Sequence, residues 1–215
     1  MTAYHELSHA IVGHFLEHSD PIHKISIISR GQALGHTISL PSEDRLLTTK
    51  AQLSDTMAMT LGGRTAEQIV FGELTTGASD DLEKVTATAG QMVTRFGMSE
   101  KLGPRVFGHN HAQPFLGRQR STAPDYSPVI AREIDNEIRH MVDAAHERAE
   151  EILLEHRDAL TTIAEILLDR ETLSREQFES LLAGEDDRDA IEPVATPAQP
   201  GRRERLGAGE GRMVA

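Results

Sequence analysis

The chain of 215 residues contains no cysteine, no tryptophan and only 4% aromatic residues. Without cysteine, neither a disulfide framework nor a thiolate metal site can form, so a metal ion would have to be held by histidine or carboxylate side chains. Hydrophobic residues make up 38% of the chain. With so few aromatics among them, this composition favours a helical protein with an aliphatic core.

Excess basic charge, long apolar runs and a phosphate-binding loop are missing as well. The formal net charge of −12 argues against nucleic acid as a partner. No apolar run approaches the roughly 18 residues of a membrane-spanning helix, and no signal peptide is apparent, so we expect the chain as given to be soluble. The sequence also lacks a G-x-x-x-x-G-K-[ST] motif, which excludes that type of nucleotide site.

Residues 5–9 read H-E-L-S-H, which matches the H-E-x-x-H pattern of zinc-dependent hydrolases. On a helix, positions i and i+4 lie about 40° apart around the axis, so His5 and His9 can reach one metal ion. Glu6 then lies beside the open coordination position, where its carboxylate can take a proton from the water that attacks a carbonyl. Apolar residues at spacings of three and four over residues 4–16 indicate a helix with one buried face. The pattern predicts a zinc site with Glu6 as general base for amide hydrolysis.

Two histidines need a third protein ligand. The extended motif H-E-x-x-H-x-x-G-x-x-H is excluded, because Val12 and Phe15 occupy the positions of its glycine and its last histidine. The richest candidate stretch is 75–82, with Asp80 and Asp81 in the first turn of a predicted helix. Backbone dipoles keep a carboxylate ionised there, which suits a metal ligand. Such stretches are also ordinary helix caps, so the residues alone leave the third ligand open.

Hydrophobic periodicity and capping residues divide the chain into elements. We predict helices over residues 3–18, 50–71, 80–96, 127–155, 158–168 and 174–182, and strands over 24–29 and 34–40 with a turn at 30–32. Thr49, Ser79 and Ser127 are the predicted helix caps. Gly62 and Gly63, in the middle of the second helix, indicate that another backbone packs closely against it.

These elements give a mainly α fold class: a zinc-binding H-E-x-x-H helix with a small β-hairpin and edge strand, then a C-terminal helical bundle and a disordered tail. We expect a metallopeptidase core over 1–125, a helical subdomain over 126–183 and a disordered tail over 184–215. The tail has few large apolar residues, so it cannot bury enough surface to fold. Since the metal motif begins at residue 5, we expect the chain to be part of a longer protein.

Several motifs in a fixed order resemble the peptidase domain of the FtsH family, which are membrane-anchored ATP-dependent zinc proteases. They are residues 5–9 (HELSH), 35–37 (GHT), 61–67 (LGGRTAE), 76–82 (TGASDDL) and 96–104 (FGMSEKLGP), and the similarity continues through 115–118 and the helices from 126 to 182. The family usually has Ala-Gly in place of Leu7 and Ser8, Tyr in place of His36 and Asn in place of Asp80.

The resemblance implies a ligand set and a base. His5, His9 and Asp81 would bind one Zn²⁺ per chain, and Glu6 would be the catalytic residue. Glu67 matches a family glutamate close to the site, and we interpret it as orienting a ligand histidine from outside the metal shell.

The resemblance also implies a substrate strand and partners. Gly35, His36 and Thr37 would lie on an edge strand that binds an extended substrate through backbone hydrogen bonds. His36 could also donate a hydrogen bond to the substrate or to the developing oxyanion. The implied activity is endopeptidase cleavage of unfolded chains in protein quality control. The chains would be delivered by an ATPase module of a membrane-anchored parent, with this domain facing the cytoplasm. We expect the domain itself to associate as a homo-oligomer through its helical half, and the resemblance implies a hexamer.

Two other functions are compatible with the residues. The chain could be a metal-free helical assembly module that keeps the H-E-x-x-H pattern without bound metal, a possibility that zinc content decides. It could also be a zinc hydrolase of small molecules, but small substrates need a closed pocket and an exposed strand edge argues against one.

Overall fold

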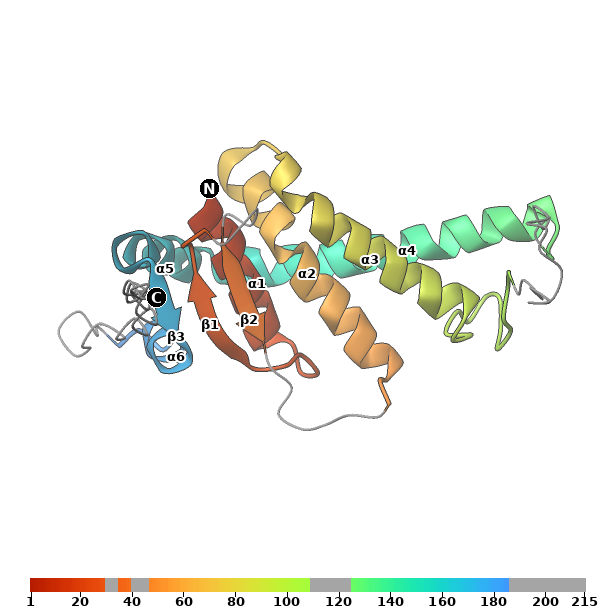
Figure 1. Cartoon of the computed structure of the whole chain (residues 1–215), viewed down its shortest axis with the longest axis horizontal. Helices are drawn as coiled ribbons and strands as arrows, with labels where there is room; N and C mark the ends of the chain where they lie inside the picture. Colours follow the sequence, from red (N-terminus) through yellow and green to blue (C-terminus); the bar gives the residue numbers. More distant parts are fainter. Residues whose placement is uncertain (30–34, 40–46, 109–124, 186–215) are drawn as a thin grey trace, which may run out of the picture.

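A computed structural model of the chain describes residues 1–29, 35–39, 47–108 and 125–185 (Figure 1). The predicted turn at 30–32, the ends of the predicted strand 34–40, the motif at 115–118 and the tail from 186 onward lie outside these residues. The mainly α fold class is confirmed. In chain order the elements are α1 (Thr2–Phe15), β1 (Ile22–Ser26), β2 (His36–Ser39), α2 (Lys50–Phe71), η1 (Thr76–Ala78), α3 (Ser79–Thr94), α4 (Pro128–Glu155), α5 (Arg157–Arg170), β3 (Thr172–Ser174) and α6 (Arg175–Leu182).

The sheet has three antiparallel strands in the order β2-β1-β3. Residue Ile25 of β1 pairs with Thr37 of β2 on one side and with Leu173 of β3 on the other. The sequence analysis did not predict β3, because three residues are too short to show an alternating pattern. Among the described residues β2 has a strand partner on one side only, so its other edge is available for pairing.

Helix α1 lies between the sheet and the other long helices (Figure 1), and α2 packs closely against it. A Cβ atom at Gly62 would lie 2.9 Å from the backbone oxygen of Ser8, and one at Gly63 would lie 2.5 Å from the ring of His5. The close approach predicted from the two glycines is therefore confirmed. Helix α2 stays unbroken over its 22 residues and begins with the predicted cap, since the side chain of Thr49 accepts a hydrogen bond from the Gln52 N–H.

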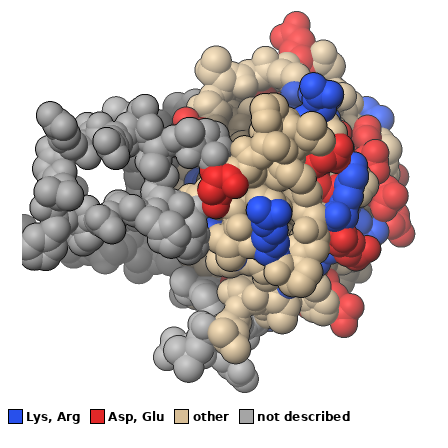
Figure 2. All heavy atoms as spheres, turned by 90° about the vertical axis from the view of Figure 1, so that its right-hand side faces the viewer, with Lys and Arg blue, Asp and Glu red and all other residues tan. Residues whose placement is uncertain are grey.

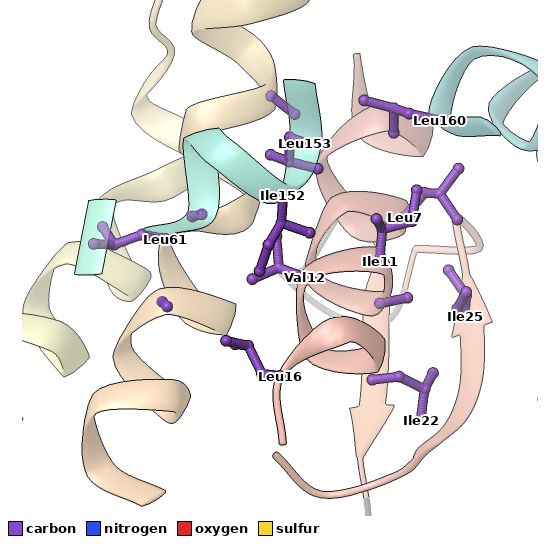
Figure 3. Packing of buried hydrophobic residues seen from close by; sticks show 14 of the residues in the cluster. Leu7, Ile11, Val12, Leu16, Ile22, Ile25, Leu61, Ile152, Leu153 and Leu160 are labelled. Atoms are coloured by element: carbon purple, nitrogen blue, oxygen red, sulfur yellow. The ribbon is translucent and has the colours of Figure 1, made fainter. Parts of the chain in front are cut away.

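The main core joins both ends of the chain. The buried side chains Leu7, Ile11 and Val12 of α1 meet residues of the sheet, of α2 and of the C-terminal helices (Figure 3). Fully burying one such side chain stabilises the fold by about 1.5–3 kcal/mol. The labelled contributors from the other elements are Leu16, Ile22, Ile25, Leu61, Ile152, Leu153 and Leu160. Residues from both sides of position 125 belong to this cluster. The division into a metallopeptidase core over 1–125 and a helical subdomain over 126–183 stays a prediction.

Several predicted ends of elements are wrong. Helix α1 stops at Phe15 instead of residue 18, because Leu16 takes an extended conformation (φ −96°, ψ 131°). Strand β1 stops at Ser26, beyond which Ile28 is half exposed. Helix α3 stops at Thr94 and not at residue 96. The end of α3 widens, because the Phe96 N–H donates to the Gln91 oxygen five residues back, the spacing of a π turn.

The predicted cap of α3 is also wrong. Ser79 is the first residue of this helix, and the N-cap is Ala78, which makes no side-chain capping hydrogen bond. The short 3₁₀ turn η1 precedes α3, and the side chain of Thr75 caps that turn by accepting from the Gly77 N–H. Helix α3 thus continues directly from the 3₁₀ turn η1. The capping preferences of single residues do not reveal such a continuous turn.

Helix α4 extends away from the core beside the end of α3 (Figure 1). Its predicted start is confirmed, since Ser127 caps it and Pro128 occupies the first turn. A second small cluster, consisting of Val93, Phe107 and Ile134, joins this end of α4 to α3 and its C-terminal segment. Figure 2 shows this end of the molecule, where acidic and basic side chains lie next to one another on the described surface.

None of the described helices combines the length and the apolar character needed to cross a membrane.

Candidate metal centre

Helices α1 and α3 bring three potential ligands together. His5 and His9 lie one turn apart on α1, with ring centroids separated by 4.8 Å. Asp81, in the first turn of α3, places its Oδ2 3.3 Å from the Nε2 of His5 and 3.4 Å from the Nε2 of His9. All three atoms lie within 4.8 Å of one another. Two imidazole nitrogens and a carboxylate oxygen at this spacing fit a Zn²⁺ site with an open position for water or substrate.

The other ring nitrogen of each histidine contacts an acceptor. The Nδ1 of His5 lies 3.0 Å from the Oε1 of Glu67, and the Nδ1 of His9 lies 2.9 Å from the backbone oxygen of Met59. Since neither acceptor carries a proton to donate, we assign the hydrogen to Nδ1 in both rings. This tautomer leaves both Nε2 atoms free to bind a metal ion.

Sequence reasoning found Glu67 but missed Met59. Glu67 belongs to a motif and is a carboxylate, whereas Met59 contributes only its carbonyl oxygen. Every residue has a carbonyl, so residue type gives no signal for this contact. The position of Met59 on α2 could have suggested the contact. Met59 lies eight residues before Glu67 on the same helix, and the two glycines between them bring that helix against α1.

Glu67 links the two halves of the site. Its side chain is buried, and besides contacting His5 it accepts hydrogen bonds from the backbone N–H of Thr75 at 2.9 Å and from the Thr75 hydroxyl at 3.1 Å. Thr75 caps the turn that leads into α3. One carboxylate therefore contacts a histidine of α1 and also fixes the segment that carries Asp81.

Glu6 lies on α1 between the two histidines and is 8% exposed. The hydroxyl of Thr37 on β2 lies 2.9 Å from its Oε2 and 2.7 Å from its backbone oxygen. Gly35 approaches the same side chain, since a Cβ there would lie 2.7 Å from the Cγ of Glu6. The base predicted from the sequence is thus in contact with the predicted substrate strand.

An open cleft of about 810 Å³ contains all of these groups. The eight predicted site residues, His5, Glu6, His9, Gly35, His36, Thr37, Glu67 and Asp81, all line it. The Nδ1 of His36 is buried and makes no hydrogen bond to the described residues.

Comparison with known proteins decides the family. The model of the peptidase family M41 matches residues 1–181. The chain belongs to peptidase family M41. It is 65% identical over 92% of its length to the ATP-dependent zinc metalloprotease FtsH 1 of Conexibacter woesei, and it spans 30% of that protein.

Other relatives match a slightly smaller part of the chain at lower identity. The chain is 51% identical to the ATP-dependent zinc metalloprotease FtsH 3 of Symbiobacterium thermophilum, over 85% of the chain and 29% of that protein. It is 47% identical to the ATP-dependent zinc metalloprotease FtsH of Mycobacterium tuberculosis, over 85% of the chain and 24% of that protein. The chain therefore spans less than a third of these curated relatives, and the resemblance seen in the sequence is confirmed.

This M41 chain carries two neighbouring carboxylates, Asp80 and Asp81, in the motif at 76–82. The structure brings Asp81 to the histidines, whereas Asp80 is exposed and is outside the group of potential ligands. Lys84, one turn along α3, lies with its Nζ 3.2 Å from the Oδ1 of Asp81. With Oδ1 paired to a cation, Oδ2 is the oxygen that faces the histidines.

The residues Leu7 and Ser8 fit the M41 site without disturbing it. Leu7 is fully buried in the main core, and the Ser8 hydroxyl donates to the backbone oxygen of Tyr4 on the same helix. Neither side chain is among those that line the cleft. Both differences from the usual family pattern are thus accommodated on the inner side of α1.

The electrostatics of the M41 site couple His5 to Asp81. Burial by itself would lower the pKa of His5, but the hydrogen bond to Asp81 and the charge of Glu6 outweigh it and raise this pKa above its ordinary value. Burial would raise the pKa of Asp81, but its contacts with His5 and His9 keep this pKa far below the usual range. Asp81 is therefore ionised at neutral pH, as a metal ligand must be.

Proposed function

We propose that this chain is a zinc-dependent endopeptidase domain that hydrolyses peptide bonds in unfolded protein chains. The observation that carries the proposal is the meeting of His5, His9 and Asp81 within 4.8 Å in an open cleft that also contains Glu6. Membership of the M41 peptidase family supports it. A metal-free assembly module would have no need for three ligand atoms and a carboxylate around one point.

In this proposal His5, His9 and Asp81 hold the zinc ion, and Glu67 and the carbonyl of Met59 orient the two imidazoles. When bound there, zinc supplies positive charge that polarises a substrate carbonyl and lowers the pKa of an adjacent water to about 7. Glu6 is the one carboxylate of α1, and it lines the same cleft as its neighbour His5. Its role is to take the proton from the attacking water and to return it to the leaving nitrogen.

The free edge of β2 supports a polypeptide as the substrate. An extended chain can pair with such an edge through backbone hydrogen bonds, which requires little sequence preference. Gly35, His36 and Thr37 stand at the start of this strand and line the cleft. His36 would contact the bound chain or the developing oxyanion. Because the cleft is open to solvent, it is less suited to enclosing a small molecule.

We further propose that the domain acts within a longer protein. The chain spans 30% of the FtsH 1 protein of Conexibacter woesei, whose name describes an ATP-dependent enzyme. An ATPase module elsewhere in the same protein would unfold substrates and deliver them to the cleft. The parent would be anchored in a membrane with this domain facing the cytoplasm. It would form a hexamer, whose stoichiometry light scattering at moderate salt would measure.

Zinc content and proteolysis together test the proposed function. The protein should bind about one zinc per chain and cleave casein, an unfolded substrate. Glu6→Gln should keep the zinc and the fold but lower cleavage by more than about 100-fold, because it removes the base and leaves the ligands. Absence of zinc from the folded protein would favour the assembly module. Activity of Glu6→Gln within tenfold of wild type would show that Glu6 is not the base.

A further inference from the structure

The side chain of Glu6 is held by strand β2, and only one of its carboxylate oxygens is held. The hydroxyl of Thr37 lies 2.9 Å from Oε2, and no described residue makes a hydrogen bond to Oε1. The same hydroxyl lies 2.7 Å from the backbone oxygen of Glu6, so its single proton is shared between this oxygen and Oε2. Both distances are ordinary for O–H···O hydrogen bonds, and they join residues 31 positions apart in the chain.

Gly35 gives Glu6 the room to adopt this position. A Cβ atom at Gly35 would lie 2.7 Å from the Cγ and 2.8 Å from the Oε1 of Glu6, closer than real Cβ atoms come to other atoms. The carboxylate therefore lies directly over the backbone at the beginning of β2. Thr37, two residues on, points to the same side of the strand, which is the side that faces α1.

We propose that Thr37 is a positioning residue for Glu6, anchoring Oε2 so that Oε1 remains the oxygen that takes and returns the proton. The inference rests on the proposed function, because it assumes that Glu6 is the base. It adds a consequence for substrate binding. A peptide that pairs with the free edge of β2 orders the strand that holds the base, so binding and the orientation of Glu6 are coupled.

Steady-state cleavage of a peptide by the zinc-loaded protein tests the role of Thr37. Thr37→Val keeps the shape of the side chain and removes the hydroxyl, and it should lower kcat by about 10-fold to 100-fold with KM changed less than about twofold. Thr37→Ser restores the hydroxyl and should stay within about threefold of wild type. Thr56→Val is the matched control, since its exposed hydroxyl bonds only the Gln52 oxygen at 2.8 Å, and it should change neither constant.

Three kinetic results would overturn the proposal. These are an unchanged kcat in Thr37→Val, a rise in KM alone, or a Thr37→Ser variant as impaired as Thr37→Val. The last result would show that the methyl group, and hence packing, matters. Zinc content must stay at about one per chain in each variant, so that loss of metal is not mistaken for loss of positioning.

A second measurement does not depend on activity. The melting temperatures of the metal-free wild type, Thr37→Val, Glu6→Ala and the double variant form a thermodynamic cycle. If Thr37 holds the Glu6 carboxylate, Thr37→Val should lower the melting temperature less in the Glu6→Ala background than in wild type, because only the contact with the backbone oxygen of residue 6 is then lost. Additive shifts would overturn the contact with the carboxylate. If the wild type cleaves no peptide, the proposed function is contradicted. The four melting temperatures then still show whether Thr37 contacts the Glu6 carboxylate.

Discussion

Each side chain that faces the proposed metal position has a second partner that fixes the atom it presents. His5 contacts Glu67, His9 contacts the carbonyl of Met59, and Asp81 contacts Lys84. A histidine held at Nδ1 can offer only Nε2, and a carboxylate held at one oxygen offers the other. These protein contacts therefore direct the three ligand atoms toward one point.

The neighbouring carboxylates of α3 give a prediction at this scale. Asp81→Asn should weaken zinc binding by more than about 100-fold, since it removes a charged ligand, whereas Asp80→Asn should change it by less than about threefold. Competition with a chromophoric chelator measures both affinities. A larger loss in Asp80→Asn would mean that the extra carboxylate of this chain is the ligand.

At the scale of elements, the contact between α1 and α2 sets the distance between the histidines and their orienting partners. Gly62 and Gly63 remove two side chains from the face of α2 that touches α1. The Met59 carbonyl and the Glu67 carboxylate are then carried to the two rings by the same helix. A helix with larger residues at these positions would stand further away and would lose both contacts.

Gly62→Ala should therefore destabilise the protein by about 1–3 kcal/mol, because the added methyl meets the backbone oxygen of Ser8 at 2.9 Å. Gly90→Ala in α3 is the matched control. Its Cβ would meet only the Cδ1 of Ile138 at 4.0 Å, and the gain in helix propensity should stabilise the protein by about 0.5–1 kcal/mol. Denaturant unfolding of the metal-free forms measures both changes in the free energy of unfolding. If both variants were stabilised or both destabilised, the proposed difference between Gly62 and Gly90 would be contradicted.

At the scale of the whole molecule, the His5–Asp81 pair makes the stability of the metal-free protein depend on pH. The pKa of His5 is raised in the folded state above 6.5. Its contribution is fully present below the unfolded value and is lost as pH rises through the folded value. The pKa of Asp81 is lowered, so its contribution is present above the unfolded value of 3.8 and is lost only in strong acid.

The melting temperature of the protein in EDTA should accordingly fall from about pH 6 to about pH 9, more than titration of exposed histidines would cause. Asp81→Asn should reduce this fall, because the partner that raises the pKa of His5 is gone. The melting temperature of the zinc-loaded protein should instead rise over the same pH range, since protons compete with the metal for histidine. A melting temperature in EDTA that rises over this range would contradict the assigned direction of the His5 shift.

The helices, the pair His5 and His9 with Glu6 between them, and the close approach at Gly62 and Gly63 could be predicted from the residues alone. These follow from periodicity, spacing and the absence of side chains, which are local properties of the chain. The resemblance to FtsH added Asp81 and Glu67. Local patterns could not choose between Asp80 and Asp81, because both stand at the start of the same helix.

Only the tertiary structure decided which groups meet across the molecule. The carbonyl of Met59 became a partner of His9, Thr37 a partner of Glu6, and β3 a third strand, although no residue type marks any of them. Backbone atoms are the same in every residue, and a hydroxyl can bond many acceptors. Which one it bonds depends on how α1, α2 and the sheet are packed, and that packing is a property of the whole core.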